Sequence, residues 1–348
     1  MRAGGVRRGG LLHLGAAIDQ PREYDAGAYA ELARLAERGA LDFVTLDGTL
    51  AGPGPGPGPG PGPGPGPGLD TTGVLARVAH ETGRIGLVPV VTTADGDPDT
   101  VAALDRVSGG RAGLLTRHAE EPGPARDRTG HRAEEPGPAR DLAGHRAGEP
   151  GPARDLAGHL ADEPASAVRV TGGPGAPPGR VVRFADVTDR HTGAVAARHA
   201  DVALIRAVNA AQAADLREQL TARAAEYGRA PGEPAVLACL RIDLGDGERA
   251  AEPGHGGGGP RPGPQGPLYR GGPVDLAELI AVWHAQGAVD GFHLVPVEPR
   301  RDLERLVNGT VAVLQHRGLF RTFYPGGTLR EHLALARPPA VRFAGSAG

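Results

Sequence analysis

The 348-residue sequence has one cysteine, Cys239, and no lysine, so all 38 of its basic residues are arginine. A single cysteine excludes an intramolecular disulfide framework and fits a reducing compartment, and we therefore expect a cytoplasmic protein. Cys239 lies in the apolar run 235–242, where a small buried core residue is the expected role and a reactive nucleophile is the alternative.

Aromatic residues make up only 3% of the chain, and no apolar run approaches the roughly 20 residues that a membrane helix needs. Arg7 and Arg8 precede the apolar stretch 11–18 in the manner of a twin-arginine export signal. This stretch is short and contains His13, so we interpret it as a first strand. The formal net charge of −3 gives no reason to expect binding to nucleic acid or to an anionic membrane, and neither partner is predicted.

Glycine and proline are abundant, at 57 and 34 residues, and much of the excess lies in three blocks. Residues 53–68 alternate Pro and Gly, which predicts a disordered linker over 52–68, because proline removes backbone donors and glycine adds chain entropy. Residues 119–164 hold copies of a 14-residue repeat, AxEPGPARDxxGHx, and have too few large apolar side chains to offset the entropy of ordering. We expect them to be disordered and their recurring histidines to bind no metal. Residues 252–267 form a third block, which predicts a Gly/Pro-rich loop.

Outside these blocks, short apolar runs alternate with helical patterns. Continuous apolar runs of this length are typical of parallel strands that are covered on both faces. Eight strands that alternate with helices favour one α/β domain over residues 1–348, a (β/α)8 TIM-like barrel, over an open sheet. The repeats replace the helix after the fourth strand, so the sequence leaves open whether the barrel is complete and closes. The predicted strands are residues 11–18, 41–46, 85–91, 111–116, 181–185, 201–206, 235–242 and 290–295.

The predicted helix at 275–286 shows the local signals most fully. Asp275 is predicted to cap its first turn and Gly287 to end it. One apolar stripe is formed by Leu276, Leu279, Ile280 and Trp283. The helix is predicted to bury Leu279, Ile280 and Trp283 against the sheet.

Four segments outside the low-complexity blocks are 36–50 (AERGALDFVTLDGTL), 84–93 (RIGLVPVVTT), 104–113 (LDRVSGGRAG) and 197–205 (ARHADVALI). The C-terminal stretches at 287–294 (GAVDGFHL), 302–318 and 317–338 follow them. In this order, the segments resemble the luciferase-like, FMN-dependent monooxygenases, in particular the branch related to nitrilotriacetate monooxygenase. The three C-terminal stretches look like the final strand, last helix and tail of that branch.

This resemblance implies that reduced FMN binds at the C-terminal ends of the strands and activates oxygen there for a small organic substrate. A separate flavin reductase is the implied partner. Ligand sites of barrels lie at the same end of the strands on general grounds. The strand-end residues carried over by position as flavin contacts are Asp47, Thr92, Thr93 and Thr116. The alternative is that these polar residues only close strands into loops.

The turn after the fifth strand, 185–193, is the candidate phosphate site. The resemblance implies that Thr188 supplies a hydroxyl there, and that the helix opening, whose amides face the phosphate, is formed by His191, Thr192 and Gly193.

Two carboxylates oppose this assignment. Asp186 and Asp189 would repel a phosphate unless they point away or are neutralised by an arginine such as Arg190. The alternative function of Asp189 is a plain cap of the following helix.

Three hypotheses therefore remain open. The chain is an FMN-dependent monooxygenase, a catalytically inactive barrel that no longer binds flavin, or a deazaflavin-dependent oxidoreductase. The sequence singles out no catalytic residue, and it gives neither the substrate nor the oligomeric state. Titration with FMN discriminates the first hypothesis from the second.

Overall fold

The computed structural model describes residues 11–20, 26–48, 69–92, 98–117, 181–245 and 259–336. The predicted linker at 52–68 and the predicted repeats at 119–164 lie outside the described residues. Of the third block, 252–267, the part from residue 259 is described. There Arg261 and Leu268 exchange two backbone hydrogen bonds, of 2.9 and 2.8 Å, across a turn.

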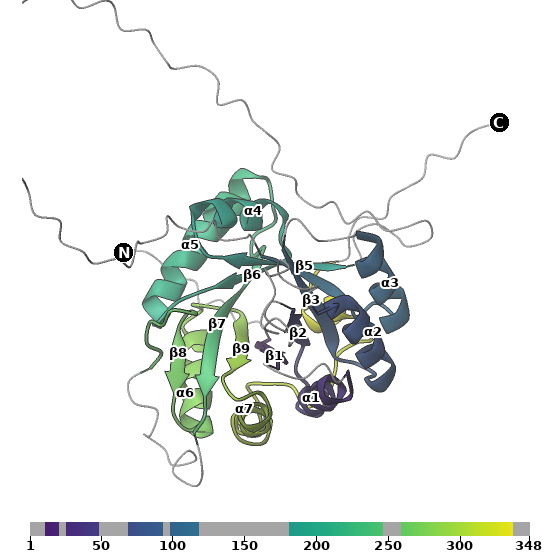
Figure 1. Cartoon of the computed structure of the whole chain (residues 1–348). Helices are drawn as coiled ribbons and strands as arrows, with labels where there is room; N and C mark the ends of the chain where they lie inside the picture. Colours follow the sequence, from purple (N-terminus) through teal and green to yellow (C-terminus); the bar gives the residue numbers. More distant parts are fainter. Residues whose placement is uncertain are drawn as a thin grey trace, which may run out of the picture. The chain divides into compact units, whose positions relative to one another are not determined.

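Eight parallel strands of the described chain form a closed barrel (Figure 1). Strands pair in sequence order from β1 to β7, and β9 closes the ring by pairing with both β7 and β1. The short strand β8 (Leu268–Arg270) pairs with the end of β7 and extends the sheet. All eight predicted strands are confirmed, and closure, which the sequence left open, is decided. The barrel strands are β1 (His13–Ala17), β2 (Phe43–Asp47), β3 (Gly86–Thr92), β4 (Gly113–Arg117), β5 (Val182–Val187), β6 (Val202–Ile205), β7 (Ala235–Asp243) and β9 (Gly291–Pro296).

Helices surround this barrel (Figure 1). In the described chain, none of them is long and apolar enough to cross a membrane. The last long helix has a π-helical stretch, η2 (Leu306–Val311), between α7 (Pro299–Arg305) and α8 (Ala312–His316). The others are α1 (Ala26–Arg38), α2 (Thr71–Glu81), α3 (Pro98–Ser108), α4 (Arg190–His199), α5 (Ala210–Glu226), α6 (Pro273–Ala285) and α9 (Leu329–His332).

Each barrel strand is buried on both faces, which is why its apolar run is continuous. Outward side chains, such as Leu14 and Phe292, pack against the helices. Inward side chains, such as Phe43 and Phe184, fill the barrel and lie with ring centroids 4.7 Å apart. This alternation decides which strand-end residues point into the mouth of the barrel and which point outward.

The interior is packed closely enough to require glycine at particular positions. A Cβ atom added at Gly15 would lie 2.3 Å from the Phe43 ring. A Cβ atom at Gly86 would lie 2.5 Å from Leu329, the first residue of α9. Gly86 begins β3, so α9 packs at the N-terminal end of the strands and leaves the C-terminal end for a site.

Helix α6 begins two residues earlier than the predicted cap. Its N-cap is Gly272, and Pro273 occupies the first helical position, so the prediction that Asp275 caps the helix is wrong. Proline suits this position because it has the helical φ and lacks an N–H that would be unsatisfied there. Gly287 follows the helix with φ +69°, as expected for a residue that ends it.

Candidate functional site

Charged side chains from three strands converge at the C-terminal mouth of the barrel. Asp47 ends β2, Arg117 ends β4, and Asp186 lies near the end of β5. Two positions before each of them stands an inward residue of the barrel interior, Thr45, Leu115 or Phe184. Because successive strand side chains alternate between the faces, the three charged residues also point inward. We call these three residues, together with Asp19 and Arg206 just beyond β1 and β6, the mouth cluster.

The mouth cluster is linked by ion pairs. Arg117 donates from Nη1 to Asp47, and its Nε lies 3.6 Å from Oδ2 of Asp186. Arg206 Nη2 donates to the same Oδ2 at 2.7 Å. The carboxylates are buried, at 4% and 5% exposure of the Asp47 and Asp186 side chains, whereas the arginine side chains are 38% and 33% exposed. The arginine side chains therefore lie between the buried carboxylates and the solvent.

Two polar atoms of the mouth cluster are buried without a hydrogen-bond partner among the described residues. They are Oδ1 of Asp186 and Nε of Arg117. One is an acceptor and the other a donor, and buried polar groups are costly to leave unpaired.

Asp19 adds a third carboxylate to the mouth cluster. Its Oδ1 accepts a hydrogen bond from the backbone N–H of Asp47. Burial, together with the nearby charge of Asp47, raises the pKa of Asp19 to about 7, against the lowering effects of this hydrogen bond and of Arg117. Asp19 is thus the carboxyl group of the mouth whose protonation changes near neutral pH.

A neutral polar group lies deeper in the barrel. His293 on β9 hydrogen-bonds through Nε2 to Thr45 Oγ1 at 2.9 Å, and its Nδ1 lies 3.5 Å from Cys239 Sγ. Burial, aided by the positive charge of Arg117, lowers the pKa of His293 to about 3, so the imidazole is neutral. Burial likewise raises the pKa of Cys239 to about 12, which keeps the thiol protonated and speaks against the nucleophile alternative.

The turn between β5 and α4 is satisfied by its own side chains. The carboxylate of Asp189 accepts from the backbone N–H of Thr192 at 2.8 Å and caps α4. The Thr192 hydroxyl accepts from the backbone N–H groups of Thr188 and Asp189, both at 3.0 Å. Gly193 follows in the first turn and donates to the Asp189 carbonyl. The capping alternative for Asp189 is therefore the arrangement found.

The arginines that neutralise Asp186 differ from the one expected. The pairing partners are Arg117 and Arg206, which come from β4 and from the segment after β6. For Arg190 the contact found is made by its carbonyl, which accepts from Arg223 at 3.2 Å.

The remaining sequence candidates are placed as follows. The side chain of Thr116 leaves β4 on the face opposite to that of Arg117, and its hydroxyl donates to the Phe184 carbonyl at 3.3 Å. Thr92 ends β3, but its side chain is outside what is described, and Thr93 lies outside the described residues. The structure thus brings Asp47 into the mouth cluster and joins Thr188, Thr192 and Gly193 in one turn.

Sequence reasoning missed four members of the site: Asp19, Arg117, Arg206 and His293. A signal for Arg117 and Arg206 was available, because each follows an inward apolar residue by two positions at a strand end. Asp19 and His293 carry no comparable signal, since their roles depend on burial and on neighbours from other strands.

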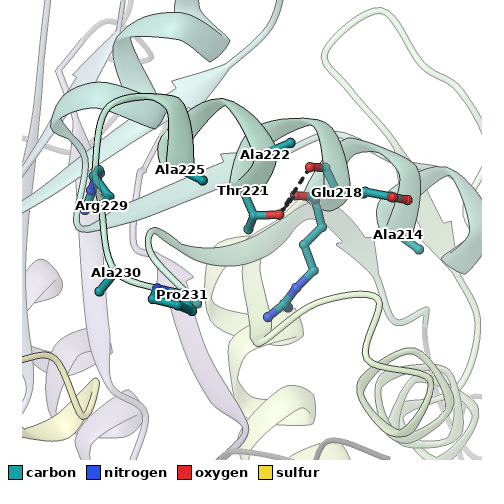
Figure 2. Close-up of a pocket in the computed structure, with 10 residues that line it drawn as sticks. Ala214, Glu218, Thr221, Ala222, Ala225, Arg229, Ala230 and Pro231 are labelled. Carbon is teal, nitrogen blue, oxygen red and sulfur yellow. Dashed lines mark hydrogen bonds between the residues drawn. The ribbon is translucent and has the colours of Figure 1, made fainter. Parts of the chain in front are cut away.

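Two cavities lie away from the mouth. Figure 2 shows the one along α5, of about 460 Å³, which Ala214, Glu218 and Thr221 line together with Ala230 and Pro231 of the loop that leads into β7. The other, of about 510 Å³, lies between α1 and α7. Both are on the helical exterior, so neither belongs to the mouth cluster.

These features define the class of the protein. It is a closed parallel (β/α)8 barrel whose polar groups gather at the end of the strands where barrels hold their ligands.

Comparison with known proteins narrows the class. No protein-family model matches the chain. Over 68 residues it is 44% identical to nitrilotriacetate monooxygenase component A of Aminobacter aminovorans, and this match covers 20% of the chain and 15% of the relative. Over 71 residues it is 39% identical to the N-acetyl-S-(2-succino)cysteine monooxygenase of Bacillus subtilis, covering 20% and 16%. The chain thus matches less than a fifth of the length of these relatives.

Solved structures share the fold over much more of the chain. An EDTA monooxygenase from Chelativorans sp. BNC1 superposes with a TM-score of 0.63 at 17% identity, covering 94% of this chain and 98% of that one. A coenzyme-dependent tetrahydromethanopterin reductase from Methanopyrus kandleri gives 0.55 at 16% identity, covering 87% and 99%. The chain is thus similar to monooxygenases over a short stretch of sequence and shares its barrel fold with these solved structures.

Proposed function

We propose that this chain is a flavin-dependent oxidoreductase of the monooxygenase type, acting on a small organic substrate at the C-terminal mouth of the barrel. The observation that carries the proposal is the mouth cluster, in which inward polar groups of β2, β4 and β5 meet at the ligand-binding end of the barrel. The relatives that match in sequence are monooxygenases by name.

The mouth cluster fits the ring system of a flavin. Asp186 Oδ1 and Arg117 Nε have no hydrogen-bond partner in the described part of the chain, and an acceptor beside a donor suits a ring that carries both N–H and carbonyl groups. Below them lie apolar side chains of the barrel interior, Leu115, Phe184 and Leu204, which exclude water from the floor. The flavin supplies the oxygen chemistry when it is bound, and the chain's own residues orient it and keep the site dry.

The phosphate of FMN does not fit the first turn of α4 in the same way. The backbone N–H of Thr192 already donates to the Asp189 carboxylate, and this carboxylate would repel a phosphate placed beside it. The α4 turn therefore contributes little to phosphate binding unless Asp189 moves.

We further propose that the flavin is reduced FMN and that a separate reductase delivers it in the cytoplasm. The matched nitrilotriacetate monooxygenase is named as a component A, which supports a system of more than one protein.

Flavin binding tests this function directly. The purified chain is titrated into FMN and, in parallel, into a deazaflavin, and the fluorescence of each cofactor is followed. We expect quenching of FMN that saturates in the micromolar range. Quenching by the deazaflavin alone would favour hydride transfer instead, and absence of both would leave the inactive barrel.

The inactive barrel has an observation in its favour. Asp47, Asp186 and Asp189 are all engaged by groups of the chain itself, through Arg117, Arg206 and the capped turn of α4. Because these carboxylates are already paired within the chain, the site needs no ligand to balance their charges.

A further inference from the structure

The mouth cluster selects the kind of ligand group that it can hold. Three carboxylates, of Asp19, Asp47 and Asp186, face the two guanidinium groups of Arg117 and Arg206. The arginine charges are thus already offset, so the mouth has no surplus positive charge for an anion. A neutral group meets no such penalty.

The unused hydrogen-bonding capacity is specific. Within the described residues, Asp186, 5% exposed, has one acceptor without a hydrogen-bond partner, Oδ1. Arg117 has one such donor, Nε, whose contact at 3.6 Å with Oδ2, the other oxygen of the Asp186 carboxylate, is longer than a hydrogen bond. Nε and Oδ1 are therefore close enough to contact adjacent atoms of one ligand. The complementary ligand group has a donor next to an acceptor, as in an amide or an imide.

We propose that Arg117 and Asp186 bind the imide edge of the flavin's pyrimidine ring. Asp186 Oδ1 accepts the hydrogen bond of the ring N–H, and Arg117 Nε–H donates to the neighbouring ring carbonyl. This assignment rests on the proposed flavin function and names the part of the cofactor that the mouth recognises.

Arg117 admits the ring. The two atoms that bind the ring are buried in the structure, so the ring reaches them when the guanidinium of Arg117, whose side chain is 38% exposed, shifts toward the solvent and keeps Nε directed at the ring. Asp186 is held from the other side by Arg206 at 2.7 Å and keeps its orientation when Arg117 shifts.

Two flavin analogues without a phosphate or ribityl chain test the assignment. Lumiflavin has the ring N–H, and 3-methyllumiflavin carries a methyl group in its place. Fluorescence titration of the full chain should give at least about tenfold weaker binding of the methylated analogue, because a hydrogen bond to a charged acceptor is lost. Equal binding of both analogues would overturn the assignment while flavin binding stands. Binding of neither would overturn both.

The variant Asp186→Asn replaces one hydrogen-bond acceptor by a donor and keeps the shape of the side chain. Arg206 holds the amide oxygen in place of Oδ2, so an NH2 group stands where Oδ1 was. We expect the preference for lumiflavin over its methylated analogue to fall to within about twofold, since the acceptor is gone. A preference that persists in a folded Asp186→Asn variant would contradict the role of Asp186.

Asp189→Asn is the matched control. It makes the same chemical change three residues away, and asparagine caps helices as well as aspartate does. The preference for lumiflavin should be the same as in the wild type, and thermal unfolding checks that both variants are folded.

Discussion

The carboxylate of Asp189 and the side chain of Thr192 cap each other across the first turn of α4. Asp189 accepts from the backbone N–H of Thr192 at 2.8 Å, and the Thr192 hydroxyl accepts from the backbone N–H of Asp189 at 3.0 Å. The hydrogen bond from Thr192 lowers the pKa of Asp189, so this carboxylate stays ionised. The anion position at the start of α4 is thus filled from within the chain.

Removing this carboxylate should change which flavin binds best. In Asp189→Gly the amides of the first turn are released, at a cost of only a few tenths of a kcal/mol for the exchange of the cap. We expect the ratio of FMN affinity to riboflavin affinity to rise by about tenfold or more, because a repulsive charge is removed. Fluorescence titration measures the ratio, and an unchanged value would show that the phosphate binds elsewhere. Asp189→Asn, which keeps the cap and removes the charge, separates the two effects.

Asp19 should make the protein less stable as the pH rises. Its pKa is about 7 in the folded chain and 3.8 as the ordinary value, so between these limits the folded state binds more protons than the unfolded state. The stability of the wild type should therefore fall by up to about 1.4 kcal/mol per pH unit from pH 4 to pH 7, relative to Asp19→Asn. Urea unfolding of both proteins at pH 4, 6 and 8 measures this difference. Parallel curves for the two proteins would mean that Asp19 ionises normally.

His293 should make the protein less stable as the pH falls, which is opposite to the effect of Asp19. Its pKa is lowered from 6.5 to about 3, mainly by burial, so below pH 6.5 the unfolded state takes up a proton that the folded state excludes. Stability from this group is complete above pH 6.5 and is lost as the pH falls towards 3, by up to about 1.4 kcal/mol per unit. In His293→Gln, which cannot be protonated, that part of the acid sensitivity should disappear. NMR titration of the imidazole is the direct check, and a pKa near 6.5 would refute the expectation.

Trp283 should be a major contributor to stability. It is 5% exposed on α6, and its ring centroid lies 5.7 Å from that of Phe292 on β9, which confirms its predicted burial. Ile280 is buried as predicted, whereas Leu279 is only partly buried. Trp283→Ala should cost about 3–5 kcal/mol in the free energy of unfolding, because it leaves a cavity between helix and barrel. Val282→Ala, on the exposed side of the same helix at 48% exposure, is the control and should cost far less. A small loss at position 283 would mean that the space collapses.

The positions of the strands could be read from the sequence because their signal is local. Runs such as 41–46 and 85–91 are apolar on both faces, which is typical of strands inside a barrel, and the structure confirms them. The cap of α6 was wrongly predicted because Asp275 and the pair Gly272–Pro273 carry competing local signals for the start of a helix.

The ion pairs of the mouth cluster could not be predicted from local sequence patterns. Asp47 was found because it follows a predicted strand directly. Its partner Arg117 is 70 residues away in the sequence, and the link from Arg206 to Asp186 spans 20 residues and a helix. Only the arrangement of the strands in the barrel brings such pairs within hydrogen-bonding distance.

The sequence by itself determined the eight strands, the barrel architecture and the resemblance to the luciferase-like monooxygenases, because periodicity and segment order are properties of the chain. The tertiary structure decided that the barrel closes, that Asp189 caps α4, and that Asp186 pairs with Arg117 and Arg206. It also decided the protonation of Asp19 and His293, whose shifted pKa values arise mainly from burial. Burial and charge proximity depend on residues that are distant in sequence, and the folded barrel alone brings these together.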